Sequence, residues 1–233
     1  MAHYQATLSE RDFRSLSKHL EKLALQYRVT LEALPPGPDR AKAVHRLINQ
    51  QTEGLQAIPI TCAKGCSGCC HLEVEITQDE GELLAQTVLD GHRIDRDRLR
   101  KQASRVRNSA EWNSLVAPEN RCVFLAADDA CSVYESRPSI CRKHLVISPP
   151  SECTASNGAP HPVSIPLAEL VISTAIGLQD NPYASLSKSV EAALAKFEHL
   201  KVGAQQFDVP VEGEDLPLVP CEEVASDEPY LES

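Results

Sequence analysis

The sequence predicts a mainly α-helical fold with a short β element, arranged as a small helical domain around a cluster of cysteines. Apolar residues recur every three or four positions over several long segments, which is typical of amphipathic helices. Alternation of apolar and polar residues, which is typical of strands, is confined to short stretches. Eight of the nine cysteines lie between residues 62 and 153, so one region holds nearly all of the thiols.

Residues 9 to 57 are predicted to form a helical hairpin. Ser9 and Asp12 favour a helix start, and the run at 35–38 stops this first helix. Asp39 is then expected to cap the second helix. The apolar stripes of the two helices consist of Phe13, Leu16, Leu20, Leu23, Tyr27, Leu31 and Leu34, and of Val44, Leu47, Ile48 and Leu55. The hairpin is either a packing element or a partner-binding or dimerising surface, since the heptad-like spacing permits the second without requiring it.

The next elements are a short strand and a helix. Residues 72–76 alternate between apolar and polar side chains, which predicts a half-buried strand. Thr77 and Glu80 have the spacing of a capping box, and the helix that they begin is expected to reach about Asp90 and to end at Gly91.

The middle of the chain is predicted to hold a charged helix at 95–115 and a strand at Cys122–Leu125. A turn is expected at 128–129, and another helix is entered at Pro138, because proline suits a first helical turn. Residues 149–166 carry five prolines and are expected to be irregular.

Two further helices are predicted, at about 166–178 and 182–200. The chain is therefore divided into a helical hairpin (1–58), a cysteine-cluster domain (59–156), C-terminal helices that pack on the same core (157–201) and a flexible acidic tail (202–233).

The acidity of the chain belongs to this tail. The net charge is −10, and residues 202–233 contain nine carboxylates and neither Lys nor Arg, which leaves the rest of the chain near −1. The arginines between 93 and 107 are interleaved with Asp95 and Asp97, as on a solvated helix face. Nucleic-acid binding depends on clustered basic residues, so we expect no nucleic-acid partner.

The cysteines are expected to be reduced. The first residues contain no apolar core of a signal peptide, and no later stretch is apolar enough to cross a bilayer, which predicts a cytoplasmic protein without membrane contact. In that compartment, clustered cysteines are typical of metal or redox sites rather than of a disulfide framework. An odd total of nine also fits a paired framework poorly.

The spacing of the cysteines predicts metal ligation. Four of them lie in "CAKGCSGCC" at 62–70, where glycines permit the tight turns that bring thiolates around one metal. Eight thiols suffice for two tetrahedral sites or one multi-iron cluster. The predicted ligands are Cys62, Cys66, Cys69, Cys70, Cys122, Cys131, Cys141 and Cys153. Side chains at adjacent positions usually point apart, so one of Cys69 and Cys70 reaches a second metal, bridges two metals or binds nothing. Cys221, alone in the tail, is expected to be incidental.

These residues carry a resemblance to a known family. The segments "CAKGCSGCC" at 62–70, "CVFL" at 122–125 and "CSVYESRPSICR" at 131–142, with Cys153, resemble the YkgJ-like cysteine-cluster proteins, also named CxxCxxCC, a zinc- or iron-chelating domain. The first gap here has three residues where the family label has two. The resemblance implies a metal site of eight cysteines in a bacterial-type protein, and it implies no reaction.

Three functions follow as alternatives, one of which is a purely structural zinc domain whose function lies in the N-terminal hairpin or the acidic tail. Of the other two, the first is a metal-binding protein that holds zinc or an iron or iron-sulfur centre. The second is an iron-sulfur enzyme for redox chemistry or methyl transfer to a protein substrate, because a related cysteine region occurs in flagellin lysine N-methylases. The chain contains no phosphate loop, nucleophile elbow or zinc-protease helix, so a reaction would have to come from the metal. The sequence thus leaves open whether the protein is an enzyme.

Residues beside the cysteines are expected to support the metal. Arg137 and Arg142 can offset the negative charge of a thiolate-rich site and donate hydrogen bonds to sulfur, and Tyr134 can exclude water or serve as a core aromatic. His71 and His144 are either ligands or neighbours of the site. Thiolates held together without metal would repel one another, so folding is expected to depend on the metal.

Overall fold

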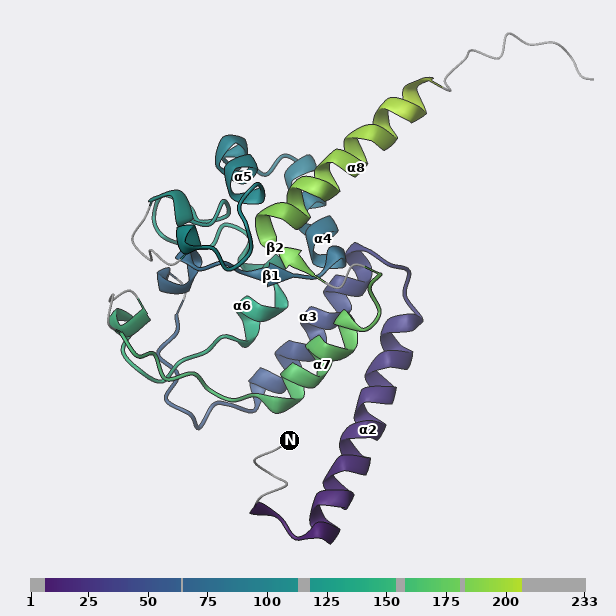
Figure 1. Ribbon diagram of the computed structural model, residues 1–233, viewed down its shortest axis with the longest axis vertical. Helices are drawn as coiled ribbons and strands as arrows, with labels where there is room; N and C mark the ends of the chain where they lie inside the picture. Colours follow the sequence, from purple (N-terminus) through teal and green to yellow (C-terminus); the bar gives the residue numbers. More distant parts are fainter. Residues whose placement is uncertain (1–6, 64, 113–117, 154–157, 181–182, 207–233) are drawn as a thin grey trace, which may run out of the picture.

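The protein is described by a computed structural model that covers residues 7–63, 65–112, 118–153, 158–180 and 183–206. It is mainly helical with one short two-stranded sheet, as the sequence predicts (Figure 1). The helices and strands are α2 Glu10–Glu32, α3 Pro38–Glu53, β1 Glu75–Ile76, α4 Gln78–Leu89, α5 Arg96–Ala103, α6 Ser139–Lys143, α7 Pro166–Ile176, β2 Ala184–Ser185 and α8 Leu186–Gln206.

The hairpin of α2 and α3 is confirmed. The Ser9 side chain accepts a hydrogen bond from the Asp12 backbone N–H at 3.2 Å and so begins α2. The start of α3 differs from the prediction, because Gly37 rather than Asp39 occupies the cap position. Gly37 has φ +121°, which a side chain would disfavour, and the proline that follows it supplies the first helical residue.

Helices α2 and α3 pack on α7, and this contact forms one of two apolar cores (Figure 1). Its buried members are Leu31, Ala43, Val44, Ile48, Ile165, Ala168, Val171 and Ala175. Burial at three- and four-residue intervals explains why these segments are helices, since each turns one apolar stripe toward the others. The first half of α2 projects away from this core (Figure 1), and its stripe there is only half-buried.

The second core lies between α4, α5 and α8 and backs the cysteine region. Its buried members are Ile76, Leu84, Ala85, Val88, Leu99, Val123, Phe124, Val133, Leu186, Val190, Ala193 and Leu194. The predicted start of α4 is confirmed, because Thr77 and Glu80 form both hydrogen bonds of a capping box. Its predicted end is also confirmed, at Gly91 with φ +107°.

Two predicted elements are shorter in the structure. The helix expected at 95–115 ends at Ala103, because only Leu99 and Gln102 of α5 are buried and Val106 beyond it is 73% exposed. Asn108 then takes φ +54°, which a helix cannot contain. The strand expected at Cys122–Leu125 is replaced by a single bridge between Leu125 and Cys131, across the predicted turn at 128–129.

The strand expected at 72–76 is reduced to β1, whose partner is β2. The two pair antiparallel, with Glu75 opposite Ser185 and Ile76 opposite Ala184. Helix α8 follows β2 directly, and the Leu186 N–H donates to the Val74 carbonyl at 2.7 Å. The sheet therefore pins the start of α8 to the chain that leaves the cysteine region.

Helices α7 and α8 confirm the two predicted C-terminal helices with slightly different ends. Part of the predicted acidic tail, residues 202–206, continues α8, and the rest of the tail with Cys221 lies outside the described residues. Within the part of the chain that the structure describes, no helix is long and apolar enough to cross a membrane.

Buried charges join the two cores. Arg40 of α3 forms an ion pair with Asp79 of α4 at 2.5 Å, and both side chains are almost completely buried. Asp79 also accepts from the Gly37 N–H at 2.7 Å and from Gln179 at 2.7 Å. One carboxylate therefore ties the loop before α3, α4 and the segment after α7 together, which fixes the hairpin against the rest of the molecule.

Candidate metal centre

The first four cysteines lie on a turn and a single 3₁₀ turn. Gly65 has φ +92°, and the Cys66 N–H donates to the Ala63 carbonyl at 3.0 Å, so the chain reverses between Cys62 and Cys66. Residues 68–71 form the 3₁₀ turn η1, which carries Cys69 and Cys70. The expected positive φ is therefore confirmed at Gly65, whereas Gly68, for which it was also expected, lies in η1 without a positive φ.

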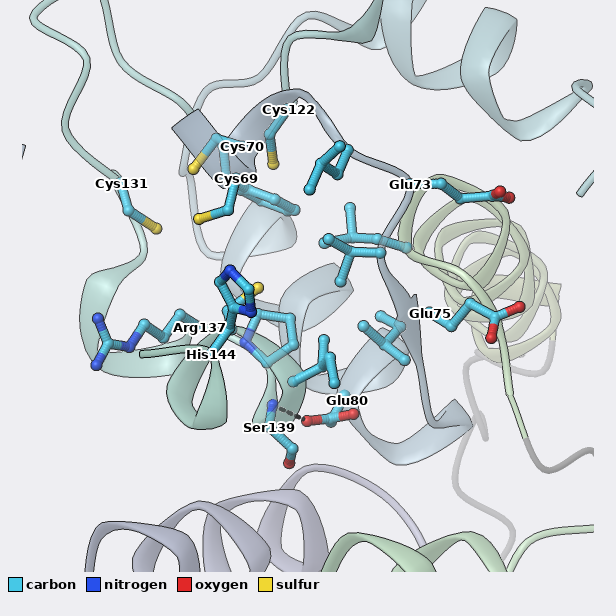
Figure 2. Close-up of a pocket in the computed structure, with 18 of the residues that line it drawn as sticks. Cys69, Cys70, Glu73, Glu75, Glu80, Cys122, Cys131, Arg137, Ser139 and His144 are labelled. Atoms are coloured by element: carbon cyan, nitrogen blue, oxygen red, sulfur yellow. Dashed lines mark hydrogen bonds between the residues drawn. The ribbon is translucent and has the colours of Figure 1, made fainter. Parts of the chain in front are cut away.

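Cys122 and Cys131 join this turn from a separate part of the chain. The Cys122 N–H donates to the Cys70 carbonyl at 2.8 Å, which anchors the second segment on the first. The bridge from Leu125 to Cys131 and the positive φ of 62° at Asp129 then fold the segment back. Figure 2 shows Cys131 facing Cys69, with Cys70 and Cys122 beside them.

The last two cysteines are placed by short helices. Cys141 lies in α6, whose preceding residue Pro138 stands at the cap position and leaves no N–H to satisfy. Cys153 ends the 3₁₀ turn η5, residues 150–153, which packs against η1. Cys62 is held further by the Val146 N–H, which donates to its sulfur at 3.3 Å.

One cavity of about 490 Å³ gathers the thiols (Figure 2). It is lined by seven of the eight predicted ligands, Cys62, Cys66, Cys69, Cys70, Cys122, Cys131 and Cys141. Cys153 is half-buried beside them but is not among the lining residues. Thiols from three segments that are distant in sequence therefore face a common space.

The thiols lie around the cavity rather than around one point. Among the described residues, no group of three or more His, Cys, Asp or Glu side chains stands close enough together to hold one metal ion. All eight predicted cysteines are free thiols, without disulfides. The donor set fits a soft thiophilic metal such as zinc or iron. Metal binding would require the thiols to move inward from their present positions.

Burial keeps most of these thiols protonated. It raises the pKa of Cys122 to about 11, and it raises the pKa of Cys141 well above its usual value of 9.0. Cys69 is the exception, because a hydrogen bond from Cys70, helped by the charge of Arg137, lowers its pKa to about 7. The same interaction, with burial, raises the pKa of Cys70. Since a metal binds thiolates, its uptake would release protons.

Arg137 and Tyr134 lie beside the thiols. The guanidinium carbon of Arg137 is 4.0 Å from the centre of the Tyr134 ring, in a cation–π contact. The Arg137 Nε atom is buried and has no hydrogen-bond partner among the described residues. Both side chains line the cavity with the cysteines. A positive charge thus lies in the wall of the cavity, and one of its donors is unused among the described residues.

Arg142 has a different setting from Arg137. Its guanidinium donates to the Arg137 carbonyl at 2.8 Å, to Asn49 Oδ1 at 3.0 Å and to the Glu135 carbonyl. These bonds join α6 to α3 and to the loop before α6. The described hydrogen bonds therefore engage Arg142 with the residues that hold α6, although its charge also acts on the thiols of Cys131 and Cys141.

The two histidines near the cysteines also differ. His71 Nδ1 lies 3.2 Å from the Ser67 carbonyl, so this ring is engaged within its own turn. His144 lines the cavity (Figure 2), and burial lowers its pKa. The structure thus brings His144, and not His71, to the space that the thiols share.

Glu80 holds the start of α6 through a hydrogen bond that the sequence did not predict. Its Oε1 atom accepts from the Ser139 N–H at 2.6 Å and lies 3.1 Å from His45 Nε2, while Oε2 accepts from Thr77. The capping box was visible in the sequence, but the contacts to His45 and Ser139 join residues that are distant in the chain. Cys141 is thereby fixed, two residues from Ser139, against the start of α4.

Comparison with known proteins agrees with the cysteine pattern. No curated protein and no solved structure shows significant similarity to this chain. A family model covers the whole cysteine region, from the residue before Cys62 to four residues beyond Cys153. Residues 61–157 thus match the CxxCxxCC family, described as "Putative zinc- or iron-chelating domain", with which the YkgJ-like resemblance is consistent.

Proposed function

We propose that this protein binds zinc or iron through the thiolates of Cys62, Cys66, Cys69, Cys70, Cys122, Cys131, Cys141 and Cys153. One observation carries the proposal: seven of these thiols, from three distant segments, line a single cavity. The matched family description supports the same metals. Thiolates, rather than carboxylates, dominate the lining, which disfavours magnesium and calcium because these ions prefer oxygen.

Arg137 is proposed to balance the charge of the bound metal. Four thiolates around a divalent ion leave a net charge of about −2. Arg137 lines the same cavity as the thiols, and its Nε–H, which has no partner among the described residues, is suited to donate to sulfur once a thiolate approaches it. The Tyr134 ring beneath the guanidinium holds it in place. We assign to Arg142 a contribution through α6 rather than through sulfur, since its donors are already engaged.

The size of the cavity favours a second candidate, an iron-sulfur centre that supports a reaction. A sphere with the zinc–sulfur bond length as its radius encloses only about 50 Å³. The cavity is far larger, at about 490 Å³, and continues past the thiols along apolar residues such as Val74 and Phe124. That space would accommodate a cluster with its sulfides, or a substrate beside it, for redox chemistry or methyl transfer to a protein.

The proposed setting is a reducing compartment such as the cytoplasm. Thiolate sites need reduced cysteines, and the eight predicted ligands form no disulfide with one another in the structure. Cell fractionation with an antibody to the chain would check this, and recovery in an oxidising compartment would contradict it.

Elemental analysis with an absorption spectrum tests the choice of metal. Protein purified without oxygen is expected to contain zinc or iron in stoichiometric amount. Iron with acid-labile sulfide and broad visible absorption would support the cluster enzyme. Colourless protein with zinc would support a binding or structural role. Neither metal above background would contradict the proposed function.

A further inference from the structure

The cavity extends beyond the thiols. Figure 2 shows Cys69, Cys70 and Cys131 on one side of it and Glu73 and Glu75 on the other, with apolar side chains between the two sides. The apolar lining includes Leu72, Val74, Phe124, Ile172, Ile176 and Leu186. A volume of about 490 Å³ lies within the range of small-molecule sites, which are mainly apolar with a few placed polar groups. The space beyond the thiols is therefore suited to an organic molecule.

The segment that carries Trp112 borders the cavity where Glu73 and Glu75 lie. The Asn108 N–H donates to the Glu73 carboxylate at 2.8 Å, and the Arg107 guanidinium donates to the Glu75 carboxylate at 2.9 Å. Trp112 follows a few residues later, lines the cavity and is 7% exposed. These two hydrogen bonds hold the segment against β1 and the residues before it. Trp112, Glu73 and Glu75 together define the Trp112 end of the cavity.

Three other buried polar side chains line the cavity, and each is engaged within the protein. They are Gln102, Asn120 and Ser187, and none is more than 3% exposed. Gln102 donates to the Glu119 carbonyl at 2.7 Å and accepts from the Ser187 hydroxyl at 2.8 Å. Asn120 Oδ1 accepts from Arg105 at 2.6 Å. Buried polar groups are normally paired in this way, so these three need no partner from a bound molecule.

Trp112 lacks such a partner. Its Nε1 atom is buried and has no hydrogen-bond partner among the described residues. An indole N–H can only donate, so the missing partner is an acceptor atom. The guanidinium carbon of Arg105 is 4.6 Å from the centre of the indole ring, and this cation–π contact fixes the ring. A buried donor without an acceptor costs free energy, which an acceptor on a molecule in the cavity would recover.

The charges at the Trp112 end favour an uncharged molecule. Glu75 forms an ion pair with Arg107, and Arg105 lies 3.8 Å from Glu111. Glu73 accepts from a backbone N–H. Each of these charged side chains is therefore already engaged. A buried carboxylate or ammonium group on the ligand would lose its hydration without gaining a new partner of opposite charge from them.

We propose that the Trp112 end of the cavity binds an uncharged, mainly apolar small molecule whose acceptor atom, such as a carbonyl oxygen, accepts from the Trp112 Nε1–H. The carrying observation is the buried, unpaired indole donor in the wall of an apolar cavity. This inference goes beyond the proposed function, because it requires the cavity and the indole donor and no particular metal. A molecule bound there would share the cavity with the thiols and with any metal that they hold.

Two probes of nearly the same shape test the hydrogen bond. Acetylnaphthalene carries a carbonyl group, and ethylnaphthalene does not. Their affinities for the full chain, purified with its metal, are measured by equilibrium dialysis. The Trp112→Phe variant keeps an aromatic ring but loses the N–H, so it is expected to bind acetylnaphthalene about tenfold more weakly and ethylnaphthalene almost unchanged. The control Leu25→Ala, at an exposed position of α2, should leave both affinities unchanged.

Equal weakening of both probes in Trp112→Phe, or no binding of acetylnaphthalene to the unaltered protein, would overturn the proposal. A second measurement needs no variant. The chain contains a single tryptophan, so a proton–nitrogen correlation spectrum shows one indole N–H signal. Acetylnaphthalene is expected to move this signal further downfield than ethylnaphthalene does, because only the ketone accepts from the N–H. The same shift with both probes would contradict the proposed contact.

Discussion

The Cys66→Ser variant is expected to lose bound metal and to become poorly soluble, whereas Cys221→Ser should keep both properties. Structural metal sites contribute their binding free energy to folding, about 10–16 kcal/mol for small zinc domains, so losing a ligand removes much of the stabilisation. Burial raises the pKa of most of the remaining thiols, which therefore stay protonated when no metal is bound. Metal content and thermal unfolding measure the effect.

The Arg137→Gln variant is expected to lose less metal than Cys66→Ser and more than Cys221→Ser. It keeps all thiols but removes the positive charge at the cavity wall and the Nε donor, which has no partner among the described residues. Loss of such a supporting contact typically costs 10–100-fold in metal affinity, so competition with a chelator should show a weaker, not abolished, site. Equal metal retention in Cys66→Ser, Arg137→Gln and Cys221→Ser would contradict both the ligand assignment and the role of Arg137.

Glu80→Ala is expected to destabilise the protein by about 3–5 kcal/mol, because it removes one partner of a buried charged network. Glu80 is almost completely buried and accepts from Thr77 and Ser139 while it contacts His45. Its loss leaves those groups unsatisfied and frees the start of α6, which carries Cys141. Denaturant unfolding should therefore show lower stability together with weaker metal retention.

The protein is expected to lose stability in acid because of Glu80. Burial alone would raise the pKa of Glu80, but hydrogen bonds and charge from His45 and Ser139 outweigh it and lower the pKa from 4.5 to about 2. A carboxylate with a lowered pKa contributes its full stabilisation above the unfolded value of 4.5, and loses it as pH falls toward 2. Unfolding of metal-free protein should show this dependence.

Asp97→Ala provides the matched control for Glu80→Ala. Asp97 also lies in the first turn of a helix, but its side chain is 80% exposed and its ion pair with Arg100 is at the surface. Such substitutions usually change stability by less than about 0.5 kcal/mol. If Glu80→Ala and Asp97→Ala were equally stable between pH 5 and 7, the buried network would not have the proposed role.

The elements that the sequence predicted correctly are those with local causes. The stripe of α2, the capping box at Thr77 and Glu80, and the stop at Gly91 each depend on residues within a few positions of one another. The predicted length of α5 was wrong, because the spacing of charged residues does not show how many turns of a helix pack against an apolar core. Pairing of β1 with β2 could not be predicted, since it joins segments about a hundred residues apart.

The candidate site divides in the same way. The cysteines could be predicted as metal ligands from their spacing, because the thiols and the glycines of the tight turns are close together in the sequence. The separate settings of Arg137 and Arg142, five residues apart, depend on the contacts of Arg142 with Asn49 and with two carbonyls. The sequence explained Glu80 as a capping residue of α4. Its contacts with His45 and Ser139 could not be predicted, because those residues are distant from it in the chain. The proposed division into domains and the acidic tail stay predictions.

Mapping the thiols by alkylation tests the central claim most directly. Reduced protein with its metal is treated with N-ethylmaleimide before and after a strong chelator, and the modified residues are identified by mass spectrometry. The account predicts that Cys221 reacts at once while the other eight cysteines react only after chelation, with release of zinc or iron. Reaction of those eight thiols as fast as Cys221 in the untreated protein would contradict metal binding by this cluster.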